Sequence, residues 1–339
     1  MKRLLSAFIS LLTIYSSTLM AAEMTTITPD ASSPASSSLI LTSKTSSLTA
    51  TAHSFDYSLS VLQQAYYRGI DGIDSTIHLQ QGLWAGDPYQ PGGNVMPQVM
   101  LLGDLSAIGQ LDAHKDPMAV VLLNYSPGGS GQFLYLAIMA YQHDKLVNIA
   151  TQYVGDRVRV KDLTIKNNAL ILDVIQAGKQ DPACCPGDIA RRIWHLNHNK
   201  LVEVPSNQAI VRLTPAILAN TDWRLESWRY GDPVTDDSKI SLRYINGHFI
   251  GMVDCNNYTV TVNALLRPGF IDVLEQHAAI TNRKCDDPLS VHRQKRYFEQ
   301  LANVTQFTYF AGKLALTYRH DNHVGVMIFA AKKYSRNIS

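Results

Sequence analysis

Residues 239–259 read KISLRYINGHFIGMVDCNNYT, and this stretch decides the fold of the C-terminal half of the chain. Lys239–Tyr244 and His248–Val253 are each expected to form a β-strand, because the Asn246-Gly247 pair between them is a strong signal for a tight hairpin turn. The run Asp254–Thr259 is polar and is predicted to be a loop. A hairpin of this kind indicates an antiparallel sheet.

The rest of residues 210–333 predicts further strands and one helix. Thr221–Ser227 alternates between apolar and polar residues, which is typical of a half-buried strand. Asp287-Pro288 combines a helix N-cap with proline at the first helical position, so a helix is expected to begin there. This helix would carry an apolar stripe of Val291, Phe298, Leu301 and Val304, and a basic face of Arg293, Lys295 and Arg296 that we interpret as solvated surface. Three more strands are expected at Phe307–Phe310, Lys313–Arg319 and Val324–Ala330.

Residues 55–206 predict a helix that lies against a second antiparallel sheet. Ser58–Tyr67 has apolar residues at helical spacing, whereas the continuous apolar run Val120–Leu123 predicts a central strand. Strands are expected at Thr76–Leu79, Val95–Leu102, Met118–Asn124, Gln132–Tyr141, Leu146–Val154, Arg157–Ile165 and Ala169–Ile175. The predicted fold class is therefore α+β and β-rich, with two domains that are each an antiparallel sheet with one or few packing helices.

The N-terminus has the layout of a secretory signal peptide. Lys2 and Arg3 form a basic region, Leu4–Leu19 is apolar, and Met20–Ala22 supplies small residues for cleavage. The apolar stretch is too short and too rich in Ser and Thr for a membrane-spanning helix, which needs about 20 strongly apolar residues. We therefore expect residues 1–22 to be removed and the protein to be periplasmic or secreted. Residues 23–54, rich in Ser and Thr, are expected to form a disordered linker.

Composition limits the classes of partner. The chain has 339 residues, of which 46% are hydrophobic and 17% charged, and this fits two globular domains. It has 30 Lys and Arg against 28 Asp and Glu, so removal of Lys2 and Arg3 leaves 28 of each sign. Such a balance argues against a nucleic-acid binder, which needs a net basic face. No other segment is apolar and long enough to span a membrane, so we expect no transmembrane segment in the mature chain.

Motifs that resemble catalytic or metal sites are incomplete. Gly103–Asp112 has the spacing of a calcium loop, but Ile108 occupies a ligand position, and we interpret the segment as a structural turn. Gly128–Gly131 lacks the register of a nucleophile elbow and is interpreted as a glycine turn. Two histidine pairs are interpreted as exposed turn residues rather than metal ligands: His195 with His198, and His320 with His323. We therefore predict no catalytic residue, no metal and no cofactor.

The four cysteines are expected to form disulfides, because an even number in an exported chain is typical of bridges rather than free thiols. Cys184 and Cys185 are neighbours between Pro182 and Pro186, and neighbouring cysteines close only a strained ring. We favour a structural role for this pair, with a redox switch as the alternative.

Several motifs of the N-terminal half recur in one family of exported proteins. They are Gln64-Ala65-Tyr66, Gly103-Asp104-Leu105 with Asp112, Val120–Leu123, Gly128–Gly131, Gly155–Val158 and Cys184-Cys185-Pro186. With these motifs, residues 55–206 resemble the LppP/LprE-like exported domain of unknown function. The resemblance implies an envelope protein and no particular reaction.

The C-terminal half carries a second set of recognisable motifs. They are Trp223 with Leu225, Phe249 and Gly251 before Cys255–Tyr258, Thr281 four positions before Cys285, Phe298–Leu301, and Leu314–Thr317. With these motifs, residues 210–333 resemble a META domain of the HslJ-like heat-shock family. The family usually has glycine where this chain has Asp254 and Val260, so the backbone of this loop is expected to differ. The resemblance implies an envelope role in stress and drug tolerance without an established activity.

Cys255 and Cys285 are expected to pair, because they flank the loop and the helix of one predicted domain. Such a bridge would contribute roughly 3–3.5 kcal/mol in the chain-entropy model. Asn256 and Tyr258 are the candidate ligand contacts, since polar groups beside a disulfide are held in place.

These observations predict an exported, non-catalytic binding or structural protein in envelope homeostasis or stress tolerance. Its partner would be an envelope protein or a small ligand. Two alternatives remain open: a thiol-redox or hydrolytic enzyme acting on envelope material, and a secreted protein with a host or surface target.

Overall fold

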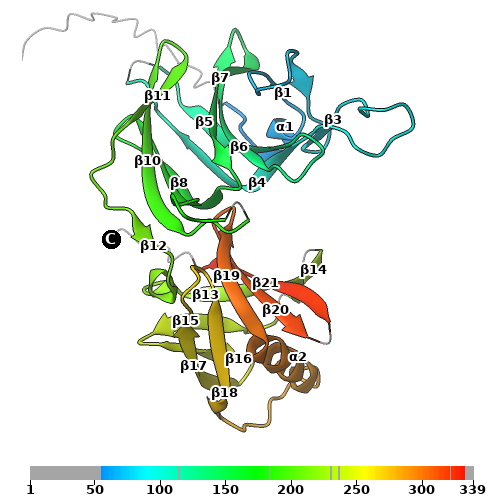
Figure 1. Ribbon diagram of the computed structural model, residues 1–339, viewed down its shortest axis with the longest axis vertical. Coiled ribbons are helices and arrows are strands. Elements are labelled where there is room, and N and C mark those ends of the chain that lie inside the picture. Colours follow the sequence, from blue (N-terminus) through cyan, green and yellow to red (C-terminus); the bar gives the residue numbers. More distant parts are fainter. Residues whose placement is uncertain are drawn as a thin grey trace, which may run out of the picture. The chain divides into compact units, whose positions relative to one another are not determined.

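A computed structural model describes residues 55–113, 115–182, 184–229, 231–235, 237–320 and 322–332. Strands dominate this described part of the chain, all ladders within it are antiparallel, and helices are few, which confirms the expected β-rich α+β class (Figure 1). The predicted signal peptide (1–22) and the predicted linker (23–54) lie outside the described residues.

Two five-stranded sheets make up most of the described part of the N-terminal half, beside a smaller two-stranded sheet. The first has the order β3-β4-β5-β6-β7, and the second has the order β11-β10-β9-β8 with β12 added beside β10. The first consists of β3 (Leu83–Ala85), β4 (Gln98–Gly109), β5 (Met118–Ser126), β6 (Phe133–Gln142) and β7 (Lys145–Asp156). The second consists of β8 (Arg159–Lys166), β9 (Ala169–Gln176), β10 (Asp188–Asn197), β11 (Lys200–Val204) and β12 (Val211–Arg212). Apolar side chains from both sheets share one core, in which Trp194 and Leu136 are fully buried.

The helix expected at Ser58–Tyr67 is wrong in extent. Helix α1 covers only Leu59–Leu62, and Tyr66–Tyr67 instead forms strand β1, which pairs with β2 (Ile77–His78). Tyr67 is fully buried and its hydroxyl donates to the carbonyl of Leu62 at 2.9 Å. The apolar residues of this segment are spaced as they are because they pack on the first sheet. They do so although the helix ends at Leu62.

The turn expected at Gly103–Asp112 is also wrong for most of its length, because β4 runs on to Gly109. The register of β4 against β5 shifts between Leu101 and Ser106, so the glycine and the acid lie in a bulge. A Cβ on Gly103 would lie 2.6 Å from a methyl carbon of Leu59, so α1 packs directly on this bulge. Gly103 and Asp104, which suggested a turn in the sequence, are thus the residues of the bulge.

A larger curled sheet forms the C-terminal half, in the order β18-β17-β16-β15-β13-β21-β20-β19 with β14 beside β13 (Figure 1). Before it, the 3-10 helix η1 covers Pro215–Leu218. The strands are β13 (Trp223–Arg229), β14 (Asp232–Pro233), β15 (Ser241–Ile245), β16 (His248–Val253), β17 (Asn256–Ala264), β18 (Ile271–Ile280), β19 (Val304–Phe310), β20 (Lys313–His320) and β21 (His323–Ala331). The predicted hairpin around Asn246-Gly247 is confirmed, with Ile245 opposite His248.

This sheet nearly closes into a barrel. The amide of Phe307 donates to the carbonyl of Gly269 at 2.8 Å, and Phe270 bridges to Gln306, so the segment just before β18 meets β19. Helix α2 (Ser290–Ala302) packs against β16, β18 and β20. Its buried residues Tyr297 and Leu301 join a core that also contains Phe249 and Phe329.

The predicted apolar stripe of this helix is confirmed at Leu301, which is buried, and wrong at Val291. The helix begins at Ser290, Val291 is 70% exposed, and Tyr297 is the buried aromatic residue of the helix. The expected polar loop Asp254–Thr259 is wrong as well, because only Asp254 and Cys255 form the turn and β17 begins at Asn256.

Direct contacts join the two predicted domains. The amide of Gly312 donates to the carbonyl of Val160 at 3.1 Å, and the Nζ of Lys313 lies 3.1 Å from an oxygen of Asp104. The domain boundary between residues 206 and 210 stays a prediction.

Candidate functional site

The tight turn between β16 and β17 is the starting point of the site. Val253 pairs with Asn256 across it, and the amide of Asp254 donates to the carbonyl of Lys239 at 3.1 Å. Asp254 has φ of 55°, in the left-handed region that Asp and Asn tolerate better than most side chains. The turn therefore needs a residue with this tolerance and directs the Asp254 side chain toward helix α2.

A nearly buried ion pair joins this turn to helix α2. The Nε of Arg293 lies 3.0 Å and 3.2 Å from the two carboxylate oxygens of Asp254, and the side chains are 11% and 7% exposed. Arg293 also pairs with Asp287. Burial lowers the pKa of the Arg293 guanidinium, but its hydrogen bonds to Asp254 and Asp287 outweigh this effect and raise the pKa overall. The expectation that Arg293 lies on a solvated face is therefore wrong.

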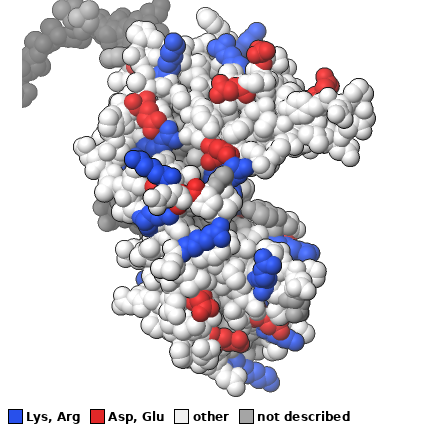
Figure 2. All heavy atoms as spheres, in the orientation of Figure 1, with Lys and Arg blue, Asp and Glu red and all other residues white. Residues whose placement is uncertain are grey.

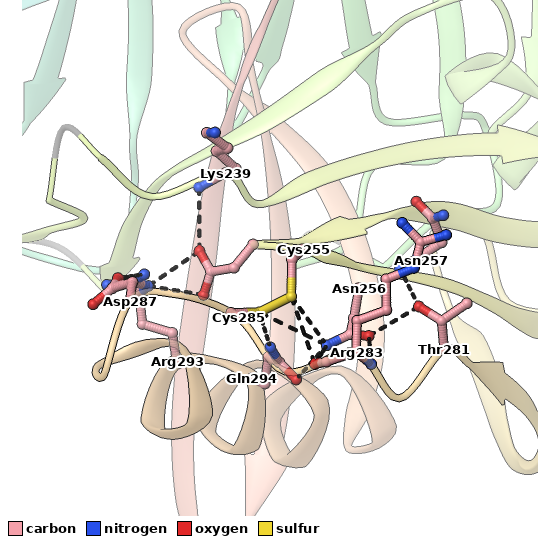
Figure 3. Close-up of a disulfide and its surroundings, with 11 residues drawn as sticks. Lys239, Cys255, Asn256, Asn257, Thr281, Arg283, Cys285, Asp287, Arg293 and Gln294 are labelled. Carbon is pink, nitrogen blue, oxygen red and sulfur yellow. Dashed lines mark hydrogen bonds and ion pairs between the residues drawn. A yellow bond between two sulfur atoms is a disulfide. The ribbon is translucent and has the colours of Figure 1, made fainter.

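Cys255 and Cys285 lie at disulfide distance, as predicted, with 5.6 Å between their Cα atoms (Figure 3). That separation is ordinary for a bridge, for which about 4.4–6.8 Å is usual. The bridge joins the turn to the segment that enters helix α2, so it reinforces the link that the ion pair makes beside it.

Asn256 uses all of its side-chain hydrogen-bonding capacity inside the protein. Its Oδ1 accepts from the amide of Arg283 at 2.7 Å and from the hydroxyl of Thr281 at 2.9 Å. Its Nδ2 donates to the carbonyl of Arg283 at 3.1 Å and to the Oε1 of Gln294 at 3.2 Å. An asparagine amide offers two donors and two acceptor lone pairs, so none is left for a ligand. Figure 3 shows Asn256 between the disulfide and Thr281.

Thr281 and Gln294 extend these contacts to both sides. Thr281 accepts a hydrogen bond from the amide of Asn257 at 3.0 Å, and the Nε2 of Gln294 lies 3.3 Å from the sulfur of Cys285. We call Asn256, Thr281, Gln294 and the backbone of Arg283 the Asn256 clamp. The clamp fixes the chain between β18 and α2 at three points.

Tyr258 lies at the base of the same strand and is buried. Its hydroxyl donates to the carbonyl of Ser241 at 3.0 Å and lies 2.7 Å from the hydroxyl of Tyr297. Burial raises the pKa of both tyrosines, so both hydroxyls remain protonated at physiological pH. Opposite Tyr258 in the ladder is Gly251, where a Cβ would lie 2.0 Å from the carbonyl oxygen of Ser241. A residue without a side chain is therefore needed at this position.

Residues 216–333 match the family model of the META domain. No curated protein matches the chain.

The match confirms the resemblance to a META domain that the motifs of the C-terminal half predicted, and the structure shows what these motif residues do. Asn256 and Tyr258 are 2% exposed each, so they position other groups and present no unengaged polar atom in this state. Their role as ligand contacts stays a prediction. The residues that the clamp presents to solvent are its neighbours in sequence, Asn282–Asp286, of which all but the half-buried Cys285 are exposed.

Sequence reasoning missed Arg293, Gln294 and Tyr297 as members of this site. Within the META domain they lie on the inward face of α2 together with Ser290 and Leu301, at helical spacing. A stripe centred on Tyr297 instead of Phe298 would have placed all of them correctly.

The remaining candidates lie elsewhere and do not converge. Cys184 and Cys185 are also at disulfide distance, so all four cysteines are paired. His195 is exposed but lies within strand β10, so its expected turn position is wrong, whereas His198 lies in the turn after that strand. His320 faces His323 at the end of the β20–β21 hairpin. Within the described ranges, no group of three or more His, Cys, Asp or Glu side chains could hold a metal ion. The same part of the chain contains no helix that is long and apolar enough to cross a membrane.

Proposed function

We propose that the chain is an exported, non-catalytic binding or structural protein of the cell envelope, with a role in stress tolerance. The observation that carries this proposal is the pairing of all four cysteines, at Cys184–Cys185 and Cys255–Cys285. Disulfides persist in oxidising compartments and are rare in the cytosol, which supports export. The META domain match supports an envelope protein of the stress-related kind.

The Asn256 clamp supports a binding or positioning role over a catalytic one. Its amide and hydroxyl groups are engaged with one another, and the ionised groups beside it, Asp254 and Arg293, form a nearly buried ion pair. A rigid support of this kind is the usual way to present an exposed recognition segment. The segment presented here is Asn282–Asp286, with the cationic side chains of Arg283 and Lys284 exposed.

The finer assignments form part of the proposal. We assign an LppP/LprE-like domain to residues 55–206 and the HslJ-like subtype to the META domain, with the periplasm or the exterior as destination. The partner would be an envelope protein or a small ligand and not a nucleic acid. Acidic and basic side chains are interspersed on the face drawn in Figure 2, which supports this exclusion because a nucleic-acid binder needs a basic face.

Fractionation tests the export part. A mature chain that starts near Ala22 or Glu23 should be released by osmotic shock, with both disulfides present in a non-reducing peptide map. Recovery of the full-length chain in washed membranes, or of reduced cysteines in the cytosolic fraction, would overturn the proposal.

Site-specific crosslinking tests the binding part. A photoreactive amino acid at Lys284 should form a discrete covalent adduct in intact cells. The same group at Val324, which is 61% exposed on β21, is the matched control and should form none. Adducts of equal yield at both positions would mean that Asn282–Asp286 is not a recognition surface.

A further inference from the structure

The second cysteine pair is built differently from the first. The Cα atoms of Cys184 and Cys185 are 3.8 Å apart, whereas about 4.4–6.8 Å is usual for a disulfide. Bridges that depart from the usual geometry and that are exposed are the more easily reduced ones. Cys184 is exposed and Cys185 is half-buried, so an incoming thiol can reach the first sulfur.

A guanidinium group lies directly on both sulfurs. The Nη2 of Arg267 is 2.7 Å from the sulfur of Cys185 and 3.4 Å from that of Cys184. The same guanidinium stacks on the ring of Phe270, 4.3 Å from its centroid, which holds it in this orientation. A neighbouring cation favours the thiolate over the thiol, so Arg267 would stabilise the sulfur that leaves when the bridge opens.

The loop that carries these cysteines is anchored independently of the disulfide. The carboxylate of Asp181 accepts from the amides of Gly178 and Gly187, at 2.8 Å each, and from Arg212 at 2.6 Å. Its pKa falls to about 2, chiefly through the hydrogen bond from Arg212. Arg212 also pairs with Asp188, so this arginine is engaged by two carboxylates, and Arg267 is the cation on the sulfurs. The loop can therefore keep its shape after reduction.

The Cys255–Cys285 bridge serves as an internal reference. Its Cα separation is ordinary, and the side chain closest to Cys285 is the neutral amide of Gln294. Among the described residues, the side chains that hydrogen-bond to its sulfurs are the neutral amides of Asn256 and Gln294. Cys255–Cys285 thus has the features of a structural bridge, whereas Cys184–Cys185 has those of a redox centre.

We propose that Cys184–Cys185 is a redox-active disulfide that exchanges electrons with a protein dithiol. A thiolate of the reduced partner attacks the sulfur of Cys184, the Cys184–Cys185 bond breaks, and its electron pair leaves on Cys185 as a thiolate beside Arg267. The second thiol of the partner, after losing its proton, attacks the partner sulfur of the mixed disulfide. Cys184 departs and takes up a proton. Two electrons pass to the cysteine pair, and the partner is oxidised to a disulfide.

This activity goes beyond the proposed binding role: it would replace the non-catalytic part of that proposal, whereas export and binding can hold with or without it. It is tested on the purified mature chain in its oxidised form, with dithiothreitol as the probe dithiol. The reaction is stopped by alkylation at intervals, and each cysteine pair is quantified by peptide mass. Cys184–Cys185 should be reduced at least about tenfold faster than Cys255–Cys285, because its geometry and its leaving group both favour exchange.

Three arginine variants test whether the positive charge at position 267 itself speeds the reduction of Cys184–Cys185. Arg267→Gln should slow reduction of Cys184–Cys185 by about tenfold, as expected for loss of a hydrogen bond to a charged group, and leave Cys255–Cys285 unchanged. Arg267→Lys keeps the charge and should retain most of the rate. Arg283→Gln is the matched control, because Arg283 approaches the other bridge through its backbone, and should change neither rate.

Equal reduction rates for the two bridges in the unsubstituted chain would overturn the proposal, and this comparison depends on no variant. It would also be overturned by an Arg267→Gln chain that reacts as fast as the unsubstituted one. If Arg267→Lys is as slow as Arg267→Gln, the positive charge of Arg267 does not stabilise the Cys185 thiolate, and the proposed role of Arg267 is overturned.

Discussion

Gly251 shows that a single missing methyl group can determine how a buried hydrogen-bond network is arranged. Because Gly251 has no side chain, the carbonyl of Ser241 comes close enough to accept from Tyr258, and Tyr258 in turn contacts Tyr297 of helix α2. The link between the sheet and the helix therefore begins at a residue that contributes no side-chain atom.

Gly251→Ala should lower the free energy of unfolding by about 2 kcal/mol or more, since its Cβ would overlap backbone rather than a flexible side chain. Denaturant unfolding measures the change. Gly129→Ala is the matched control, because a Cβ there meets nothing within 4 Å, and it should change stability by less than about 1 kcal/mol. Similar losses for the two variants would contradict the steric argument.

Asn256→Ala should destabilise the protein by about 2–3 kcal/mol, because it leaves the backbone groups of Arg283 and the side chain of Gln294 without their partner. The neighbouring Asn257→Ala is the control. Asn257 is exposed and contacts Thr281 through its backbone, so its loss should lie within about 0.5 kcal/mol. Thermal unfolding of the two variants in parallel decides the matter, and equal stabilities would count against the clamp.

At the scale of the element, the buried face of helix α2 differs from the face that the sequence predicted. Its existence and approximate position could be predicted from the Asp287-Pro288 signal, as the hairpin could from Asn246-Gly247. Its phase could not, because Val291 and Phe298 are apolar in the sequence and only the tertiary packing selects Tyr297 as the buried residue. The partners of Asn256 were invisible for a related reason, since all four of its side-chain hydrogen bonds go to residues 25 to 38 positions away, two of them to backbone atoms.

Loss of the bridge to this helix should be costly. Cys255→Ser together with Cys285→Ser should lower the free energy of unfolding by about 3 kcal/mol, because the bridge closes a loop between residues 30 positions apart. Cys184→Ser with Cys185→Ser should lower it by less than about 1 kcal/mol, since neighbouring residues close almost no chain. Urea unfolding measures both free energies, and the reverse order would refute the assignment of Cys255–Cys285 as the structural bridge.

The Asp181 loop predicts a defined acid sensitivity. The pKa of Asp181 is lowered from its ordinary value of 3.8 to about 2, so its contribution to stability is complete above about pH 4 and is lost as the pH falls toward 2. Asp181→Asn should be less stable than the unsubstituted chain at pH 7 and should lose less stability between pH 4 and pH 2. If the stability of both chains falls equally between pH 4 and pH 2, Asp181 is not the source of the acid sensitivity.

For the whole molecule, the sequence predicted the β-rich class and the position of the META domain but not the contacts between the halves. Those contacts involve the tip of the β19–β20 hairpin, where Gly312 and Lys313 meet Val160 and Asp104. Single residues at a hairpin tip carry no periodic signal, so no pattern in the sequence could identify them as an interface.

Limited proteolysis tests the predicted organisation. The segment 205–210 is largely exposed, so digestion should cleave there, strip residues 23–54 and leave two resistant pieces of about 55–204 and 211–333. Gel filtration of the digest then reports whether the pieces separate. A single protected core without cleavage at 205–210 would refute the boundary.

The pairing of β13 with β21 has a consequence for the order of folding. Trp223 lies opposite Ala331, so β13, which pairs with β15 on one side, finds its neighbour on the other side only when the last strand has been synthesised. Contacts between residues so distant along the chain form slowly, because a large loop must close first. Until then β13 presents an unpaired edge, and unpaired edges are where growing chains associate wrongly. The time between the emergence of Trp223 and that of Ala331 is thus the interval in which this domain is most vulnerable to misassembly.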